Sequence, residues 1–215
     1  MLLEKQREKI IQIALEVQKL NLVALTFGNF SIRDIETGYV CVTPSGMKYE
    51  DLKTEDIVIM DTDCNIVDGS RKPSIEASMH CAVYRKRKDV FGIVHTHSVY
   101  ATAWASCNKS IPCVLAETAA VVGGTIKCAP FKPMGSVELA EVTIEELGNS
   151  DAVLMERHGV LAVGNNIDVA LANAIIVEES AKVAYFAKNI GEISELPKDV
   201  CLKLRNDVME KYGQK

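Results

Sequence analysis

The sequence predicts a single-domain α/β protein with three layers, in which helices cover both faces of a mostly antiparallel sheet. Helical and strand-like patterns alternate along the chain without a linker, a repeat or a low-complexity segment. The first strand-like runs are short and separated by tight turns, which favours an antiparallel meander. A chain of 215 residues can bury roughly 70% of the surface that it exposes when unfolded, enough for one core. We therefore expect one domain over residues 1–215.

The N-terminal third is predicted to form one helix followed by the meander. Apolar side chains recur at helical spacing between Ile10 and Val17, and Asn21 suits a helix end. Turn residues such as Gly38 and Asp61 separate the runs that follow. Those three runs are expected as strands at 29–33, 39–43 and 57–60.

The rest of the chain alternates helices with buried strands. Ser74 is a typical N-cap for a helix expected from about Ile75 to Lys86. Two continuous apolar runs, 90–94 and 152–155, are typical of strands buried on both faces. Further helices are expected at 98–106, 136–147, 168–189 and 198–212.

Composition and charge exclude several classes of protein. The N-terminal segment 1–9 carries charge from its fourth residue, and no apolar stretch approaches the ~20 residues of a membrane span. The net charge of -5 argues against a nucleic-acid partner. Seven scattered cysteines without a C-x-x-C pair suggest reduced thiols. We expect a cytoplasmic enzyme that binds neither membranes nor nucleic acid.

Three of the four histidines stand at predicted strand ends. His95 and His97 follow the run 90–94, and His158 follows 152–155. A lone histidine is more often a hydrogen-bonded core or surface residue than a ligand, but residues i and i+2 of a strand share a face. Imidazole is a common zinc ligand, and three nitrogens without a thiolate leave an open position, as in catalytic zinc sites. The pattern therefore predicts a catalytic metal centre.

Short turns rich in Gly, Ser and Thr stand at 26–29, 43–46 and 72–74. Each one alone reads as an ordinary turn. Together they offer backbone N–H groups, hydroxyls and a helix N-terminus, which suit a phosphate group. Glu76 would lie near the same opening, although on local sequence alone the helix dipole accounts for a carboxylate there.

These segments occur in an order that resembles the zinc-dependent class II sugar-phosphate aldolase and epimerase family. The resemblance rests on Gly28-Asn29-Phe30-Ser31, Thr43-Pro44-Ser45-Gly46, Pro73-Ser74-Ile75-Glu76, Val94-His95-Thr96-His97 and His158-Gly159. It spans almost the whole chain and implies the class II aldolase fold in a cyclic homotetramer with interfacial active sites. It implies one Zn²⁺ per subunit, held by His95, His97, His158 and, in the resting state, Glu76. It places the substrate phosphate among Gly28, Asn29, Ser45, Gly46 and Ser74.

Within this family the motifs favour an aldolase. Family epimerases tend to carry Asp in place of Glu76 and a His-Ala-Asp segment that is missing from 111–124. The expected reaction is reversible cleavage of a ketose 1-phosphate, L-fuculose 1-phosphate first, to dihydroxyacetone phosphate and an aldehyde such as L-lactaldehyde. Two departures stand against that substrate, because Ile75 replaces a second phosphate-binding Ser and Ala116 aligns with a catalytic Tyr. A carboxylate near Glu117 also fits other members of the family, such as rhamnulose-phosphate aldolase or methylthioribulose-phosphate dehydratase. A ribulose-phosphate 4-epimerase is a further alternative.

The resemblance also implies roles in proton transfer. Glu76 would act as base and acid at C3, and Glu117 or Tyr212 would handle the proton of the C4 hydroxyl. His80 lies one helical turn after Glu76 and is expected in a supporting or core role. Co²⁺ or Mn²⁺ could replace Zn²⁺ at nitrogen and oxygen ligands.

Two other readings compete with this one. A Schiff-base aldolase needs a desolvated lysine, for which only Lys127 is mildly suggestive. A non-enzymatic metal-binding scaffold is disfavoured, because it has no need of a phosphate site beside an open metal.

Overall fold

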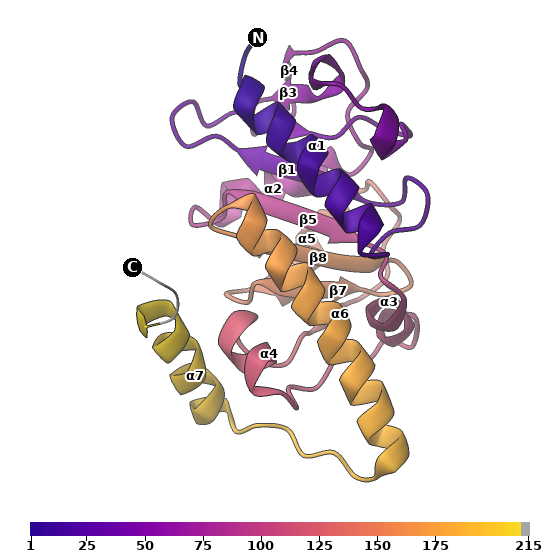
Figure 1. Ribbon diagram of the computed structural model, residues 1–215, viewed down its shortest axis with the longest axis vertical. Coiled ribbons are helices and arrows are strands. Elements are labelled where there is room, and N and C mark those ends of the chain that lie inside the picture. Colours follow the sequence, from indigo (N-terminus) through magenta and orange to yellow (C-terminus); the bar gives the residue numbers. More distant parts are fainter. Residues whose placement is uncertain (212–215) are drawn as a thin grey trace.

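An eight-stranded sheet lies between two layers of helices in the computed structural model, which describes residues 1–211 (Figure 1). The strand order is β4-β3-β2-β1-β5-β8-β7-β6. Only the β6–β7 pairing is parallel among the described strands. The strands are β1 (Asn29–Arg33), β2 (Val40–Val42), β3 (Val58–Met60), β4 (Ile66–Asp68), β5 (Gly92–Thr96), β6 (Cys128–Ala129), β7 (Ala152–Met155) and β8 (Gly159–Gly164).

Helices cover both faces of this sheet, as predicted. In Figure 1, α1 and α6 lie across the near face, and α2 and α5 lie behind it. Successive residues of a strand supply the two cores, because Val94 of β5 packs with α1, α3 and α6 whereas Ile93 packs with α2 and α5. The helices are α1 (Glu4–Lys19), α2 (Ala77–Lys86), α3 (Val99–Ser106), α4 (Ala116–Val121), α5 (Val137–Leu147), α6 (Ile167–Ile190) and α7 (Lys198–Lys211).

The last helix is attached differently from the others. An extended segment, 191–197, leads from α6 to α7, which packs against the short helix α4 (Figure 1). Arg205 fixes the pair, since its guanidinium donates to the carbonyl of Val121 at 2.7 Å and to Asp151 at 2.5 Å. The helix α7 therefore lies outside the three layers, against α4.

Most predicted elements are present with small shifts at their ends. The meander β1 to β4 is antiparallel, and Asn21, with a φ of 56°, turns the chain after α1. The predicted N-cap Ser74 is wrong: α2 begins at Ala77, and Glu76 holds the cap position. The Ser74 hydroxyl instead accepts a hydrogen bond from the Glu76 amide at 3.3 Å, closing the turn before the helix. Three strands and one α-helix of the described chain had no counterpart in the prediction: β4, β6, β8 and α4.

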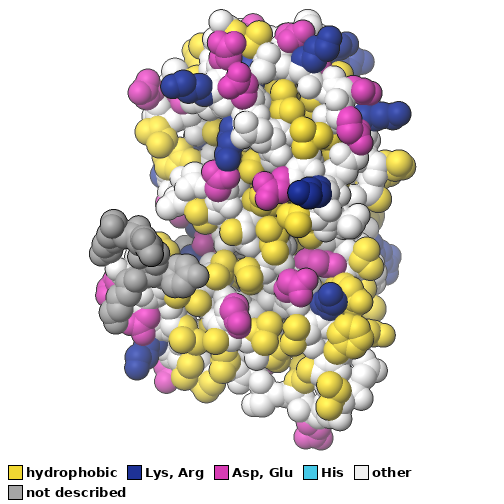
Figure 2. Space-filling model, viewed as in Figure 1, with side chains coloured by type: hydrophobic (Ala, Val, Ile, Leu, Met, Phe, Trp, Pro, Cys, Tyr) yellow, Lys and Arg dark blue, Asp and Glu magenta, His cyan; other side chains and the backbone are white. Residues whose placement is uncertain are grey.

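The face of the molecule seen in Figure 2 carries both charged and apolar side chains. Figure 2 shows acidic and basic side chains interspersed over the face that carries α1 and α6, with apolar side chains gathered over its lower half. None of the helices within residues 1–211 is long and apolar enough to cross a membrane.

Candidate metal centre and substrate pocket

Three imidazoles from two neighbouring strands meet at one edge of the sheet. His95 is in β5, His97 follows that strand directly, and His158 immediately precedes β8. Since β5 and β8 are antiparallel partners, the end of one strand lies beside the start of the other. One ligand nitrogen from each histidine lies within 4.8 Å of the other two. The convergence predicted from the strand ends is therefore present.

The hydrogen bonding of these imidazoles leaves nitrogens directed at a common point. The Nδ1 atom of His95 lies 2.8 Å from the carbonyl of Val160, so Nδ1 carries the proton of that bond and Nε2 faces the cluster. The Nε2 atoms of His95 and His97 are 3.0 Å apart. His158 is buried, and neither of its ring nitrogens makes a hydrogen bond. Buried nitrogens that converge in this way suit a bound cation.

Two of the three imidazoles have the protonation state that suits a cation. Burial, followed by the positive charge on His95, lowers the pKa of His97 to about 3 and that of His158 to about 4. Both rings are therefore neutral at pH 7 and offer a lone pair. Burial opposes the charge on His95, but the carboxylate of Glu76 raises the pKa of this histidine.

Glu76 brings a carboxylate to the same point from the N-terminus of α2. Its two oxygens lie 3.2 Å from Nε2 of His95 and of His158. The side-chain amide of Asn29 donates to the Oε2 atom at 2.9 Å and so orients the carboxylate. Burial opposes ionisation, but the two imidazoles and Asn29 lower the pKa of Glu76 well below its usual value. Three imidazoles and one ionised carboxylate form a donor set that fits a divalent cation such as Zn²⁺.

A pocket of about 180 Å³ opens beside this cluster. Two turns form its wall, and they are joined by hydrogen bonds from the Ser45 amide to the Lys72 carbonyl and from the Ser74 amide to the Thr43 carbonyl, each 3.0 Å. Gly28 has no room for a side chain, because a Cβ atom there would lie 2.6 Å from Val23. All five residues predicted to bind phosphate line this pocket: Gly28, Asn29, Ser45, Gly46 and Ser74. Glu76, His97 and His158 line it as well.

Two apolar side chains at the mouth of the pocket had not been predicted. Phe27 is 57% exposed and stacks on His97, with ring centroids 6.1 Å apart and planes at 18°. Met134 lies in the loop before α5 and lines the pocket. At Gly135 this loop packs closely against the carbonyl of Ile75. The position of Phe27 beside Gly28 could have indicated that Phe27 lies at the pocket. Met134 reaches the pocket through a tertiary contact, for which the local sequence has no signal.

Two predicted catalytic groups are not part of this pocket within the protomer. Glu117 is exposed in the first turn of α4 and does not line the pocket. Tyr212 lies outside the described residues. The structure therefore leaves the predicted roles of both residues untested.

The minor candidates have structural roles. His80 is fully buried, and its Nδ1 atom lies 2.7 Å from the Ser31 hydroxyl, outside the three-histidine cluster. Lys127 is largely exposed and lies 3.2 Å from Glu146, so it lacks the desolvation that a Schiff-base lysine requires.

Comparison with known proteins agrees with this geometry. Residues 8–185 match the family model of the class II aldolase and adducin N-terminal domain. A 5-deoxy-D-ribulose 1-phosphate aldolase from Bacillus thuringiensis serovar kurstaki is 40% identical over 214 residues, covering 100% of both chains. A solved L-fuculose 1-phosphate aldolase superposes with a TM-score of 0.92 at 32% identity, covering 95% of this chain and 96% of the other. A sugar-phosphate aldolase from Thermotoga maritima shares the fold, with a TM-score of 0.78 at 21% identity over 88% of this chain and 97% of its own.

Proposed function

The chain belongs to the family of the class II aldolase and adducin N-terminal domain and is a class II aldolase of the sugar-phosphate type, and we propose that it is a zinc enzyme that cleaves a deoxyketose 1-phosphate. The observation that carries the proposal is the cluster of three imidazoles and one carboxylate beside a pocket that the five residues predicted to bind phosphate also line. The products would be dihydroxyacetone phosphate and a short aldehyde with a methyl end.

Two substrates fit this description. A relative 40% identical over the full length is named for 5-deoxy-D-ribulose 1-phosphate, whose cleavage between C3 and C4 gives acetaldehyde. L-fuculose 1-phosphate, named for the structure at 32% identity, gives L-lactaldehyde. At Ile75 and Ala116 the chain departs from the pattern of the fuculose enzymes. We therefore place the five-carbon substrate first and the fuculose phosphate second.

The residues of the pocket divide the work in the proposed reaction. The hydroxyls of Ser45 and Ser74 and the backbone amide of Gly46 would hold the phosphate, since the amides of Ser45 and Ser74 already donate to carbonyls of the facing turn. Glu76 would move the proton at C3, acting as acid in cleavage and as base in condensation. Its ionised resting state and its hydrogen bond from Asn29 suit the role of base.

The metal would be held by His95, His97 and His158, with Glu76 as a fourth ligand in the resting state. When bound, it supplies a Lewis acid that polarises the substrate carbonyl and offsets developing negative charge. The proton of the C4 hydroxyl needs a further group, for which we retain Glu117 and Tyr212. Because Glu117 does not line the pocket of its own protomer, this role requires the proposed cyclic homotetramer with interfacial active sites. We also retain the cytoplasm as the proposed location, on the pattern of scattered cysteines.

One assay separates the possible activities. The purified enzyme is supplied with each ketose 1-phosphate, and dihydroxyacetone phosphate is measured beside the 4-epimerised and dehydrated products. We expect dihydroxyacetone phosphate with a higher kcat/KM for the 5-deoxypentulose 1-phosphate. Formation of a 4-epimer or of a dehydrated ketone alone would assign one of the other activities instead.

A further inference from the structure

Two cysteines that lie far apart in the sequence have their sulfur atoms in contact. The Sγ atoms of Cys113 and Cys201 are 3.7 Å apart, although 88 residues separate them along the chain. Both side chains are buried, with exposed fractions of 1% and 5%. They form a small apolar cluster with Ala119, Leu196 and Leu204. Both are free thiols, as are the other five cysteines.

These thiols lie where the C-terminal helix meets the body of the protein. Cys113 stands three residues before α4, and Cys201 lies in the first turn of α7. The backbone carbonyl of Cys113 accepts a hydrogen bond from the Leu196 amide at 2.8 Å, so the extended segment before α7 passes directly over it. A covalent bond between the sulfurs would therefore fasten α7 to α4.

The two thiols differ in their access to solvent. Cys201 lines an open hollow of about 670 Å³ together with the segment 123–125 and the end of the extended segment. Cys113 does not line this hollow. Burial, followed by the neighbouring Cys201, raises the pKa of the Cys113 thiol to about 12. Because Cys201 lines the hollow, a small oxidant can reach it first. Cys113 lies behind it and would act as the resolving thiol.

We propose that Cys113 and Cys201 form a reversible disulfide on exposure to a hydroperoxide, and that this bond fixes α7 on α4. The sulfur of Cys201 attacks one oxygen of hydrogen peroxide, the O–O bond breaks, and a sulfenic acid and one water form. The sulfur of Cys113 then attacks the sulfenic sulfur, the S–O bond breaks, and a second water leaves with the Cys113 proton. Two thiols are oxidised and one peroxide is reduced. Rotation of the two side chains must bring the sulfurs from 3.7 Å to about 2 Å.

The bond would restrain α4 and α7, the helices nearest in sequence to the proposed C4 proton donors. Glu117 follows Cys113 by four residues, and Tyr212 follows α7. An effect of oxidation on turnover rests on the proposed function. Formation of the disulfide does not, so the decisive experiment measures the bond itself.

The experiment maps disulfides in the full-length wild-type protein. Reduced protein is treated with hydrogen peroxide, remaining thiols are alkylated under denaturing conditions, and peptides are identified by mass spectrometry with and without dithiothreitol. We expect loss of two of the seven titratable thiols and one cross-linked peptide pair joining Cys113 to Cys201, reversed by the reductant. Closure of so long a loop should also raise Tm by roughly 4–10 °C.

Variants separate this pair from the other thiols. Cys107→Ala removes an exposed cysteine and should leave the cross-link and the Tm shift unchanged. Cys113→Ala should stop the reaction at a Cys201 sulfenic acid, which dimedone traps. Recovery of Cys113 and Cys201 as separately alkylated peptides from oxidised wild-type protein would overturn the proposal, as would cross-links confined to other cysteines. The wild-type mapping decides the question even where an alanine variant folds poorly.

Discussion

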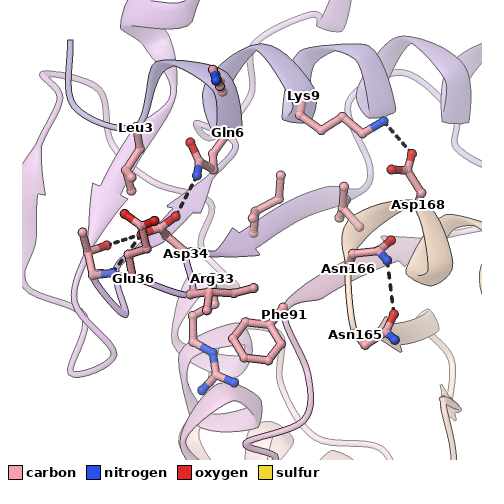
Figure 3. A pocket seen from close by; sticks show the side chains of 15 residues that line it. Leu3, Gln6, Lys9, Arg33, Asp34, Glu36, Phe91, Asn165, Asn166 and Asp168 are labelled. Atoms are coloured by element: carbon pink, nitrogen blue, oxygen red, sulfur yellow. Dashed lines mark hydrogen bonds and ion pairs between the residues drawn. The ribbon is translucent and has the colours of Figure 1, made fainter.

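The two ends of strand β1 carry pockets of opposite character. Asn29, at one end, lines the pocket of about 180 Å³ beside the imidazoles. Arg33, at the other end, lines a larger pocket of about 610 Å³ (Figure 3). By size the second of these two pockets would be the better candidate. The difference lies in how the polar groups of each pocket are partnered.

In the larger pocket the polar side chains pair with one another. Figure 3 shows Lys9 directed at Asp168, 2.5 Å away, and Gln6 donating to Asp34 at 2.7 Å. The guanidinium of Arg33 points away from α1, and its two terminal nitrogens donate to three backbone carbonyls, those of Tyr84, Lys88 and Val90, while its Nε atom makes no hydrogen bond. These contacts tie α1, β1 and α6 together.

The smaller pocket has the reverse arrangement. Neither ring nitrogen of the buried His158 makes a hydrogen bond, although Nε2 lies 3.2 Å from Oε1 of Glu76, and that Oε1 atom and the Oδ1 atom of Asn29 also lack hydrogen bonds. Such atoms cost stability unless a ligand satisfies them. Unpartnered, converging polar atoms therefore identify the site better than volume does.

Removal of the metal should have the largest effect on turnover, and this effect should come from the smaller pocket alone. We expect a chelator to abolish turnover and added Zn²⁺ to restore it, because the three imidazoles would hold the Lewis acid. His95→Ala should lose bound metal and activity together. Metal content is measured by elemental analysis beside the dihydroxyacetone phosphate assay. Full activity of the metal-free protein, with borohydride trapping on a lysine, would contradict the proposed mechanism.

Substitution of Glu76 separates metal binding from proton transfer. Glu76→Gln should retain much of the metal through the histidines but lower kcat by about two to four orders of magnitude, since the amide cannot move the proton. The matched control is Glu36→Gln, which changes a carboxylate lining the larger pocket and should leave kcat unchanged. If Glu76→Gln loses as much metal as His95→Ala and excess Zn²⁺ restores its rate, Glu76 is a ligand only.

A smaller effect is expected at the phosphate site. Ser74→Ala should weaken binding of a ketose 1-phosphate by about 1.5 to 3 kcal/mol, the range for a hydrogen bond to a charged group, and so raise KM. Turnover of a non-phosphorylated ketose, where detectable, serves as the control and should change little. Equal losses for both substrates would mean that Ser74 acts only through its hydrogen bond to the Glu76 amide.

A hydroxyl added at the neighbouring position tests the same site in the opposite direction. Ile75 is 63% exposed and lines the pocket, so Ile75→Ser removes little buried apolar surface. It should lower KM for the phosphorylated substrate if the new hydroxyl reaches the phosphate. An unchanged KM would place Ile75 outside reach of that group.

The sequence predicted the centre of the fold and of the site because both depend on local patterns. The β5 strand is continuous in apolar residues, and the H-x-H spacing beyond it leads into the metal cluster. Helix α4 could not be predicted, since its six residues carry too short a pattern and it is stabilised by α7. The start of α2 at Ala77 depends on the hydrogen bonds that join two distant turns. The contact between Cys113 and Cys201 depends entirely on chain topology.

The smallest effect is expected from the ion pair in the larger pocket. Lys9 and Asp168 contact each other at 2.5 Å, but their side chains are 35% and 63% exposed, so solvent screens the attraction. A double-mutant cycle with Lys9→Ala and Asp168→Ala, measured by urea unfolding, should give a coupling energy of about 0.2–1 kcal/mol. Neither variant should change kcat/KM, because the pair lies at the end of the sheet opposite the imidazoles. A large fall in kcat/KM with unchanged stability would show that this pocket takes part in function, and the contrast between the two ends of β1 would fail.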